Sequence, residues 1–205
     1  PITGTHVRLA AQGGIAWDDI AAKGAATIRV SPAGQAVFHL RLDKREIAST
    51  DFRLVSRQPG TWLGEYQQEG VKLTAQVKVE SLGVEGERMA LQLRNHSATP
   101  VTGTLLFPTA EKLVLGTPAD TWCFNARRGG VITNQTCQMR DEIGEGHALQ
   151  VDGLFNPRLG GGVSFQPRDL EGVFRWYCMS KDASGVSYAL EYLPETVAAG
   201  KSWKC

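Results

Sequence analysis

The sequence lacks the features that mark nucleic-acid-binding and membrane-spanning proteins. Its 205 residues contain 22 basic and 21 acidic side chains, which gives a net charge of +1. Proteins that bind DNA or RNA usually carry a clear basic excess, so we expect no nucleic-acid partner. No run of apolar residues approaches the roughly 18 that a membrane-spanning helix needs, so we expect no membrane partner.

Motifs for metals, nucleotides and serine hydrolases are also missing. None of the four cysteines forms a C-x-x-C pair, and the four histidines are scattered, so we expect no metal site. The glycines at 160–162 lack the spacing of a phosphate-binding loop, and no G-x-S-x-G elbow is present. We therefore predict no cofactor.

The first residues, 1–5, carry neither an initiating methionine nor the basic start and apolar run of a signal peptide. The length of 205 residues suits one all-β domain. We interpret residues 1–205 as a single domain excised from a longer modular chain.

What the sequence does contain is a repeated alternation of apolar and polar residues. In residues 71–79 and 89–95 every second side chain is apolar, which is typical of half-buried antiparallel strands. This phase places Leu73, Val77, Leu91 and Leu93 in the core. Similar runs, separated by turn residues rich in glycine and proline, occur at 27–30, 36–42, 104–107, 173–178 and 186–192. The pattern predicts an all-β fold, an antiparallel two-sheet β-sandwich.

Residues 116–172 read as longer loops with short strands, and the segment 120–134 is the richest of them. It places Trp122, Arg127 and Arg128 around a glycine turn and ends at Asn134. A sugar site needs an aromatic face for the C–H side of the ring and forked polar groups for the hydroxyls, so these residues are candidate ligand-binding residues. The alternative is a structural turn with Trp122 in the core and the arginines solvated or ion-paired.

His147 and Trp176 are candidate neighbours of that site. His147 lies five residues before Asp152 and could act as a general base; the alternative is a surface or structurally hydrogen-bonded histidine. His96 is the second candidate catalytic histidine. Cys123 and Cys137 flank the same glycine turn, so a hairpin could bring them together; the alternative is a pair of buried free thiols.

Several fragments resemble a known family. Residues 89–101, followed by 105–108, are similar to a passage of the galactose-mutarotase-like β-sandwich (supersandwich) domains of large bacterial glycoside hydrolases, in which one strand ends in N-x-S/T and the next in F-P. Arg128-Gly129-Gly130 with Asn134, residues 174–188 and residues 193–203 resemble later elements of those domains. The resemblance covers about residues 88–203. The catalytic His pair and Glu of a true aldose mutarotase do not align.

The resemblance implies a supersandwich fold, a carbohydrate or an adjacent catalytic domain as partner, and a secreted or periplasmic location. The leading hypothesis is a non-catalytic β-sandwich domain of a modular glycoside hydrolase, which packs against the catalytic domain or shapes its substrate site. One alternative is a free-standing carbohydrate-binding module. The other is an aldose-mutarotase-type epimerase that uses His147 or His96 with a carboxylate.

Overall fold

The computed structural model describes residues 7–18, 20–21, 27–30, 34–83, 86–126, 130–142, 151–167 and 174–205. Across these residues the chain is all-β, and the strand pairs whose registers are defined are antiparallel. The one helical element in the described part is a 3-10 turn, η1 (Ser49–Asp51). No helix in these ranges is long and apolar enough to cross a membrane. The predicted all-β class with antiparallel sheets is confirmed.

The chain forms two compact units, and each is assembled from separate stretches of sequence. Unit 1 contains Pro1–Asp18, Gly34–Pro108 and Leu193–Cys205. Unit 2 contains Asp19–Ala33 and Thr109–Tyr192. The interpretation of 1–205 as one domain stays a prediction.

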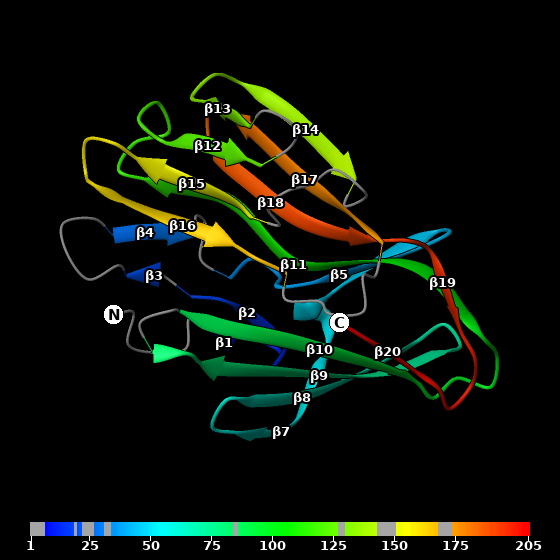
Figure 1. Ribbon diagram of the computed structural model, residues 1–205. Coiled ribbons are helices and arrows are strands. Elements are labelled where there is room, and N and C mark those ends of the chain that lie inside the picture. The colour runs from blue at the N-terminus through cyan, green and yellow to red at the C-terminus, as the bar shows by residue number, and fades with distance from the viewer. Residues whose placement is uncertain are drawn as a thin grey trace. The chain divides into compact units, whose positions relative to one another are not determined.

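Unit 1 contains a five-stranded antiparallel sheet in the order β20-β10-β9-β8-β7 (Figure 1). Its strands are β7 (Arg53–Gln58), β8 (Thr61–Gln68), β9 (Val71–Ser81), β10 (Glu87–Asn95) and β20 (Ser202–Lys204). Turns at Pro59-Gly60 and Glu69-Gly70 close the first two hairpins, and Gly60 and Gly70 adopt the positive φ that such turns require. In the next hairpin, β9–β10, Leu91 lies opposite Val77.

The remaining strands of unit 1 form two hairpins and a short ladder. β1 (Val7–Leu9) pairs with β2 (Ile15–Trp17), and β5 (His39–Leu42) pairs with β6 (Arg45–Ala48). The first part of β11 (Val101–Leu115) pairs with β5 and with β19 (Glu195–Val197).

The core of unit 1 follows the phase that the sequence predicts. Leu73, Val77, Leu91 and Leu93 are 3%, 0%, 2% and 4% exposed, so all four predicted core positions are confirmed. Beside them Phe52 contacts three aromatic rings, with centroid distances of 5.4 Å to Phe38, 6.2 Å to Trp62 and 5.7 Å to Tyr66.

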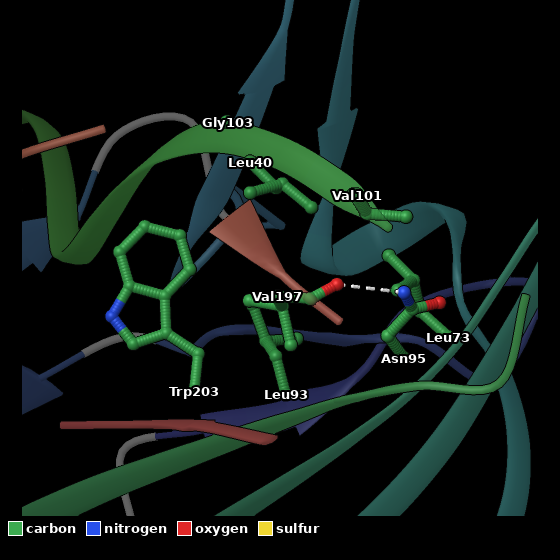
Figure 2. Close-up of a pocket in the computed structure, with 8 residues that line it drawn as sticks. All are labelled: Leu40, Leu73, Leu93, Asn95, Val101, Gly103, Val197 and Trp203. Atoms are coloured by element: carbon green, nitrogen blue, oxygen red, sulfur yellow. Dashed lines mark hydrogen bonds between the residues drawn. The ribbon is translucent and has the colours of Figure 1, made fainter. Parts of the chain in front are cut away.

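A small cavity of about 10 Å³ remains inside unit 1, and Figure 2 shows the side chains that converge on it. A space of this size has room for about one water molecule. Asn95 reaches the cavity wall, but its amide nitrogen donates to the carbonyls of Val197 and Thr99, both at 2.9 Å, and its oxygen accepts the N–H of Ser97 at 2.8 Å. Asn95 is therefore a structural corner residue, and the cavity is a packing defect rather than a ligand site.

Unit 2 contains two groups of strands (Figure 1). One is a four-stranded sheet in the order β13-β12-β15-β16. Its strands are β12 (Trp122–Asn125), β13 (Val131–Thr133), β15 (Asp152–Asn156) and β16 (Gly161–Phe165). These strands have three to five residues each, in agreement with the short strands predicted within 116–172.

The other group runs in the order β14-β17-β18-β11-β4-β3. Its strands, besides the later part of β11, are β3 (Ile20–Ala21), β4 (Thr27–Val30), β14 (Cys137–Glu142), β17 (Arg175–Asp182) and β18 (Gly185–Tyr192). The two groups pack face to face, because Phe165 of β16 stacks on Tyr188 of β18 with a centroid distance of 4.0 Å and an interplanar angle of 11°. The unit is thus β-sandwich-like.

Candidate functional site

The outward face of the four-stranded sheet in unit 2 carries a group of aromatic and apolar side chains. Side chains alternate between the two faces of a strand, and directly opposed residues share a face. Trp122 therefore shares its face with its partner Phe155, and Phe124 shares it with Ile132. The inward phase of the same strands is more deeply buried, as at Cys123 (0% exposed) and Leu154 (2%). We call the group Trp122, Phe124, Ile132 and Phe155 the aromatic face.

The rings of the aromatic face are half-buried and partly stacked. Trp122 and Phe155 lie 6.2 Å apart between centroids at an interplanar angle of 27°, so the two ring planes are roughly parallel. Phe124 is also half-buried, and Ile132 is 59% exposed. Apolar side chains of this size are usually buried, so their gathering on one outward face calls for a functional explanation.

Two glycines keep the neighbouring part of this face flat. Gly162 of β16 lies opposite Phe155, and Gly153 of β15 lies opposite Phe124. A Cβ atom at Gly162 would meet the carbonyl oxygen of Leu154 at 2.7 Å, and one at Gly153 would meet that of Val163 at 2.6 Å. Both contacts are too short for a side chain, so these positions stay open beside the rings.

Polar groups border the aromatic face at one end. Asp120, two residues before Trp122, forms an ion pair with Arg158 at 3.2 Å. Arg158 lies in the turn between β15 and β16, whose backbone is held by Asn156 through the N–H groups of Arg158 and Leu159. Asn134 follows the last residue of β13, and its amide oxygen accepts a hydrogen bond from Gln135 at 2.9 Å. A carboxylate, a guanidinium and an amide thus adjoin, along the chain, the strands β12, β15 and β13 that carry the rings.

Trp176 lies elsewhere in unit 2. It belongs to the outward phase of β17, whereas Phe165 and Tyr188 mark the inward side of both groups of strands. The Arg140 guanidinium covers the Trp176 ring at 4.0 Å from its centroid and forms an ion pair with Glu191 at 2.7 Å. The structure therefore does not bring Trp176 to Trp122, which corrects the expectation that the two are neighbours.

The other predicted site residues are separated or outside the described residues. Arg127, Arg128 and His147 lie outside the ranges that the structure describes. His96 belongs to unit 1, where its Nε2 lies 3.1 Å from the hydroxyl of Thr74 and its backbone N–H donates to Lys72. The structure does not place His96 in the same unit as Trp122 or Asn134.

Trp122 itself is on the outward phase of its strand, so the alternative that places it in the core is wrong. Inward positions of β12 are taken by Cys123 and Asn125, which are 0% and 1% exposed. The sequence could not fix this phase, because Trp122, Cys123 and Phe124 are three consecutive apolar residues.

Asp152, the predicted partner of His147, points into unit 2. It is 2% exposed, and one oxygen accepts the backbone N–H of Ala126 at 3.4 Å. Burial raises the pKa of Asp152 to about 7; the Ala126 hydrogen bond opposes this, and the nearby Asp141 carboxylate adds to it. The carboxylate faces Tyr177 and Tyr188, and burial raises the pKa of both phenols. Asp152 is thus an interior acid rather than a surface base.

One histidine–carboxylate pair in unit 1 was not singled out from the sequence. His39 Nδ1 lies 2.7 Å from Glu46, and Arg41 donates to the same carboxylate at 2.8 Å. Burial acts to raise the pKa of Glu46, but the hydrogen bond from Arg41 and the charge of His39 outweigh it, so the pKa is lowered. The sequence feature that could have indicated this pair is the two-residue turn at Asp43-Lys44. A hairpin with that turn places Arg41 opposite Glu46.

Unit 1 also has an open groove of about 360 Å³. It is lined by β1 and by residues of β7, β8 and β9, with the exposed side chains of Arg8 and Arg57 at its sides. Its aromatic residue, Trp62, is 4% exposed and donates its ring N–H to the carbonyl of Gly13 at 3.1 Å. The groove therefore presents cationic groups, but the ring of Trp62 is not exposed in it.

Comparison with known proteins assigns no family. A scan against protein-family models finds no match, and a search of the curated proteins finds no relative. Within the described residues, no group of three or more His, Cys, Asp or Glu side chains could hold a metal ion.

Proposed function

We propose that this chain is a non-catalytic carbohydrate-binding β-sandwich domain of a carbohydrate-active enzyme, and that its aromatic face contacts the sugar. The observation that carries the proposal is the stacked pair Trp122 and Phe155 on an outward sheet face. The axial C–H groups of a pyranose ring form an apolar surface that packs on such rings. Gly153 and Gly162 leave space beside them for the rest of a saccharide.

The border of the aromatic face supplies the polar half of sugar recognition. Sugar hydroxyls donate to carboxylates and amides and accept from guanidinium groups. Asp120, Arg158 and Asn134 provide these three kinds of group on the segments that adjoin β12, β15 and β13. A few placed polar groups beside a larger apolar surface are the usual composition of a small-ligand site. Arg127 and Arg128, which adjoin β12 in sequence, remain candidate ligands under this proposal.

The resemblance to galactose-mutarotase-like domains of bacterial glycoside hydrolases supports the carbohydrate setting. Under this proposal the domain packs against a catalytic domain or shapes its substrate site, and the fold is a supersandwich. The sequence elements behind it are Asn95-His96-Ser97 and Phe107-Pro108. In the structure Asn95, the last residue of β10, donates a hydrogen bond to the carbonyl of Val197 and so connects two segments of unit 1.

The test is binding of neutral hexasaccharides built from glucose, xylose, mannose or galactose. We expect at least one to bind the wild-type chain in titration calorimetry, and Trp122→Ala to weaken that binding about tenfold or more, which equals about 1.4 kcal/mol. Trp176→Ala is the matched control, because it removes a half-buried tryptophan from the other group of strands and should leave the affinity unchanged.

A third variant separates the aromatic face from the groove of unit 1. Arg57→Ala should leave binding unchanged if the sugar contacts Trp122. Binding that survives Trp122→Ala but is lost in Arg57→Ala would move the site to the groove. If none of the four hexasaccharides binds the wild-type chain at millimolar concentration, the proposal fails.

A further inference from the structure

Two cysteines of unit 2 lie near the same buried lysine, Lys181. Cys123 points inward from β12 and is 0% exposed, while Cys137 is the first residue of β14 and is partly exposed. Cys137 is close enough to Cys123 to contribute to the raised pKa of the Cys123 thiol. All four cysteines of the chain are free thiols in the structure.

Sheet packing, and not a hairpin, brings these two residues together. In the β12–β13 hairpin the residue opposite Cys123 is Thr133. The prediction that a hairpin places Cys137 beside Cys123 is therefore wrong. Cys137 instead pairs with Lys181 on β17. Because β12 and β14 belong to the two different groups of strands in unit 2, a bond between the two sulfurs would join those groups.

Lys181 connects the two strands that carry these cysteines. It is 5% exposed, and its Nζ donates to the carbonyl of Thr121 at 2.7 Å and to that of Pro118. Thr121 immediately precedes β12, and Lys181 itself lies across from Cys137. The lysine therefore ties the start of β12 to the strand pair β14–β17, next to both sulfurs.

The other cysteines are placed away from this pair. Cys178 is on the outward phase of β17, with its Sγ 3.9 Å from a carboxylate oxygen of Glu191. Cys205 belongs to unit 1, where its Sγ lies 3.7 Å from the carbonyl of Leu91. The geometry thus selects one pairing out of the four thiols.

We propose that Cys123 and Cys137 form a reversible disulfide that joins the two groups of strands in unit 2. The oxidant is a small-molecule disulfide such as oxidised glutathione. The Cys137 thiolate attacks one glutathione sulfur and releases one glutathione thiolate. Cys123 then loses its proton to solvent, and its thiolate attacks Cys137 and releases the second glutathione. The two thiols lose two electrons and two protons, which reduce one glutathione disulfide to two thiols.

The environment of Cys123 makes the second step the slow one. Burial raises the pKa of Cys123 to about 12, and the neighbouring Cys137 adds to this, while the Lys181 charge opposes it. A mixed disulfide between Cys137 and glutathione should therefore accumulate before the cross-link forms, and the cross-link should form faster as the pH rises.

The experiment uses the full chain in a buffer of oxidised and reduced glutathione, followed by alkylation, trypsin and mass spectrometry. The sequence suits this test, because trypsin cuts after Arg127 and Arg128 and so separates the two cysteines into peptides 113–127 and 129–140. We expect these peptides to remain joined, with a mass lower than their sum by two hydrogen atoms. The cross-linked chain should melt about 5–10 °C higher than the reduced chain, since the disulfide restricts the unfolded state.

Two variants control for specificity. Cys178→Ser should retain the cross-link, and Cys137→Ser, at the more exposed position, should lose it while melting like the reduced wild-type chain. Full alkylation of both Cys123 and Cys137 after oxidation would overturn the proposal, and so would cross-links spread equally over Cys178 and Cys205. The outcome is independent of sugar binding, because it is read from the wild-type chain without any saccharide.

Discussion

Replacing Asp152 with asparagine should change how the stability of the protein depends on pH. The wild-type carboxyl is 2% exposed and has a pKa of about 7, whereas its ordinary value is 3.8. The folded state therefore keeps the proton at pH values where the unfolded chain has lost it. Stability from this group is fully present below about pH 4, falls as the pH rises, and reaches a floor above about pH 7.

The magnitude follows from the two pKa values. The gap between 3.8 and about 7 corresponds to about 4 kcal/mol at about 1.36 kcal/mol per pH unit. Between pH 5 and pH 8 the wild-type chain should lose about 2–3 kcal/mol of this contribution. Asp152→Asn has no charge to bury, and its amide oxygen can still accept the Ala126 N–H. The variant should therefore gain about 2–3 kcal/mol relative to wild type over the same range.

Guanidinium unfolding at half-unit steps from pH 5 to pH 8 measures this difference. Asp182→Asn is the control, because hydrogen bonds from Ser184 lower the pKa of that exposed carboxyl. A lowered pKa makes stability depend on pH only below the ordinary value, so above pH 5 the control curve should run parallel to the wild-type curve. A difference between Asp152→Asn and wild type that stays constant within about 0.5 kcal/mol would refute the reasoning.

Two further variants test the packing of the two units. Leu91→Ala should lower the free energy of unfolding by about 2–5 kcal/mol, because the Leu91 side chain is 2% exposed. Arg94→Ala, on the exposed face of β10, should change it by less than about 0.5 kcal/mol. Equal effects of the two substitutions would mean that the buried face of β10 is wrongly assigned. Lys181→Met should cost about 2–4 kcal/mol in chemical denaturation, since it leaves the carbonyls of Thr121 and Pro118 without their ammonium donor. If Lys181→Met is as stable as wild type, the hydrogen bonds from Lys181 to the start of β12 do not stabilise the protein.

The sequence predicts β9 and β10 well because one phase of each strand is apolar and the other polar. Leu73, Val77, Leu91 and Leu93 are buried as that phase requires. A two-residue period specifies both the element and the face that it buries, provided that one face is clearly drier than the other.

The same reasoning does not settle the orientation of β17. Its inward phase is Arg175, Tyr177, Met179 and Lys181, and its outward phase contains Trp176, Cys178 and Ser180. Neither set is clearly the more apolar, so the alternation leaves both orientations open. Only the packing of unit 2, which supplies carbonyl acceptors for Lys181 and a phenol for Arg175, decides which set is buried.

The sequence predicts only one member of the aromatic face, Trp122. Trp122 is a candidate because it lies near a glycine turn. Phe155 lies far from Trp122 in sequence, and Ile132 belongs to no recognisable motif. Their placement depends on the register of β12 with β15 and β13, which is a matter of tertiary structure. The proximity of Cys123 and Cys137 depends in turn on how the two groups of strands pack.

The division of unit 1 into three stretches of sequence determines when it can be completed during synthesis. β20 forms one edge of its five-stranded sheet and pairs with β10, and β19 pairs with the first part of β11. Both strands are translated after all of Thr109–Tyr192. While the ribosome makes those residues, the backbone groups of β10 that later bond to Cys205 and Ser202–Lys204 have no strand beside them. The nascent chain therefore carries an open sheet edge from the end of β10 until β20 is made, which is the stage at which such an edge can recruit a wrong strand.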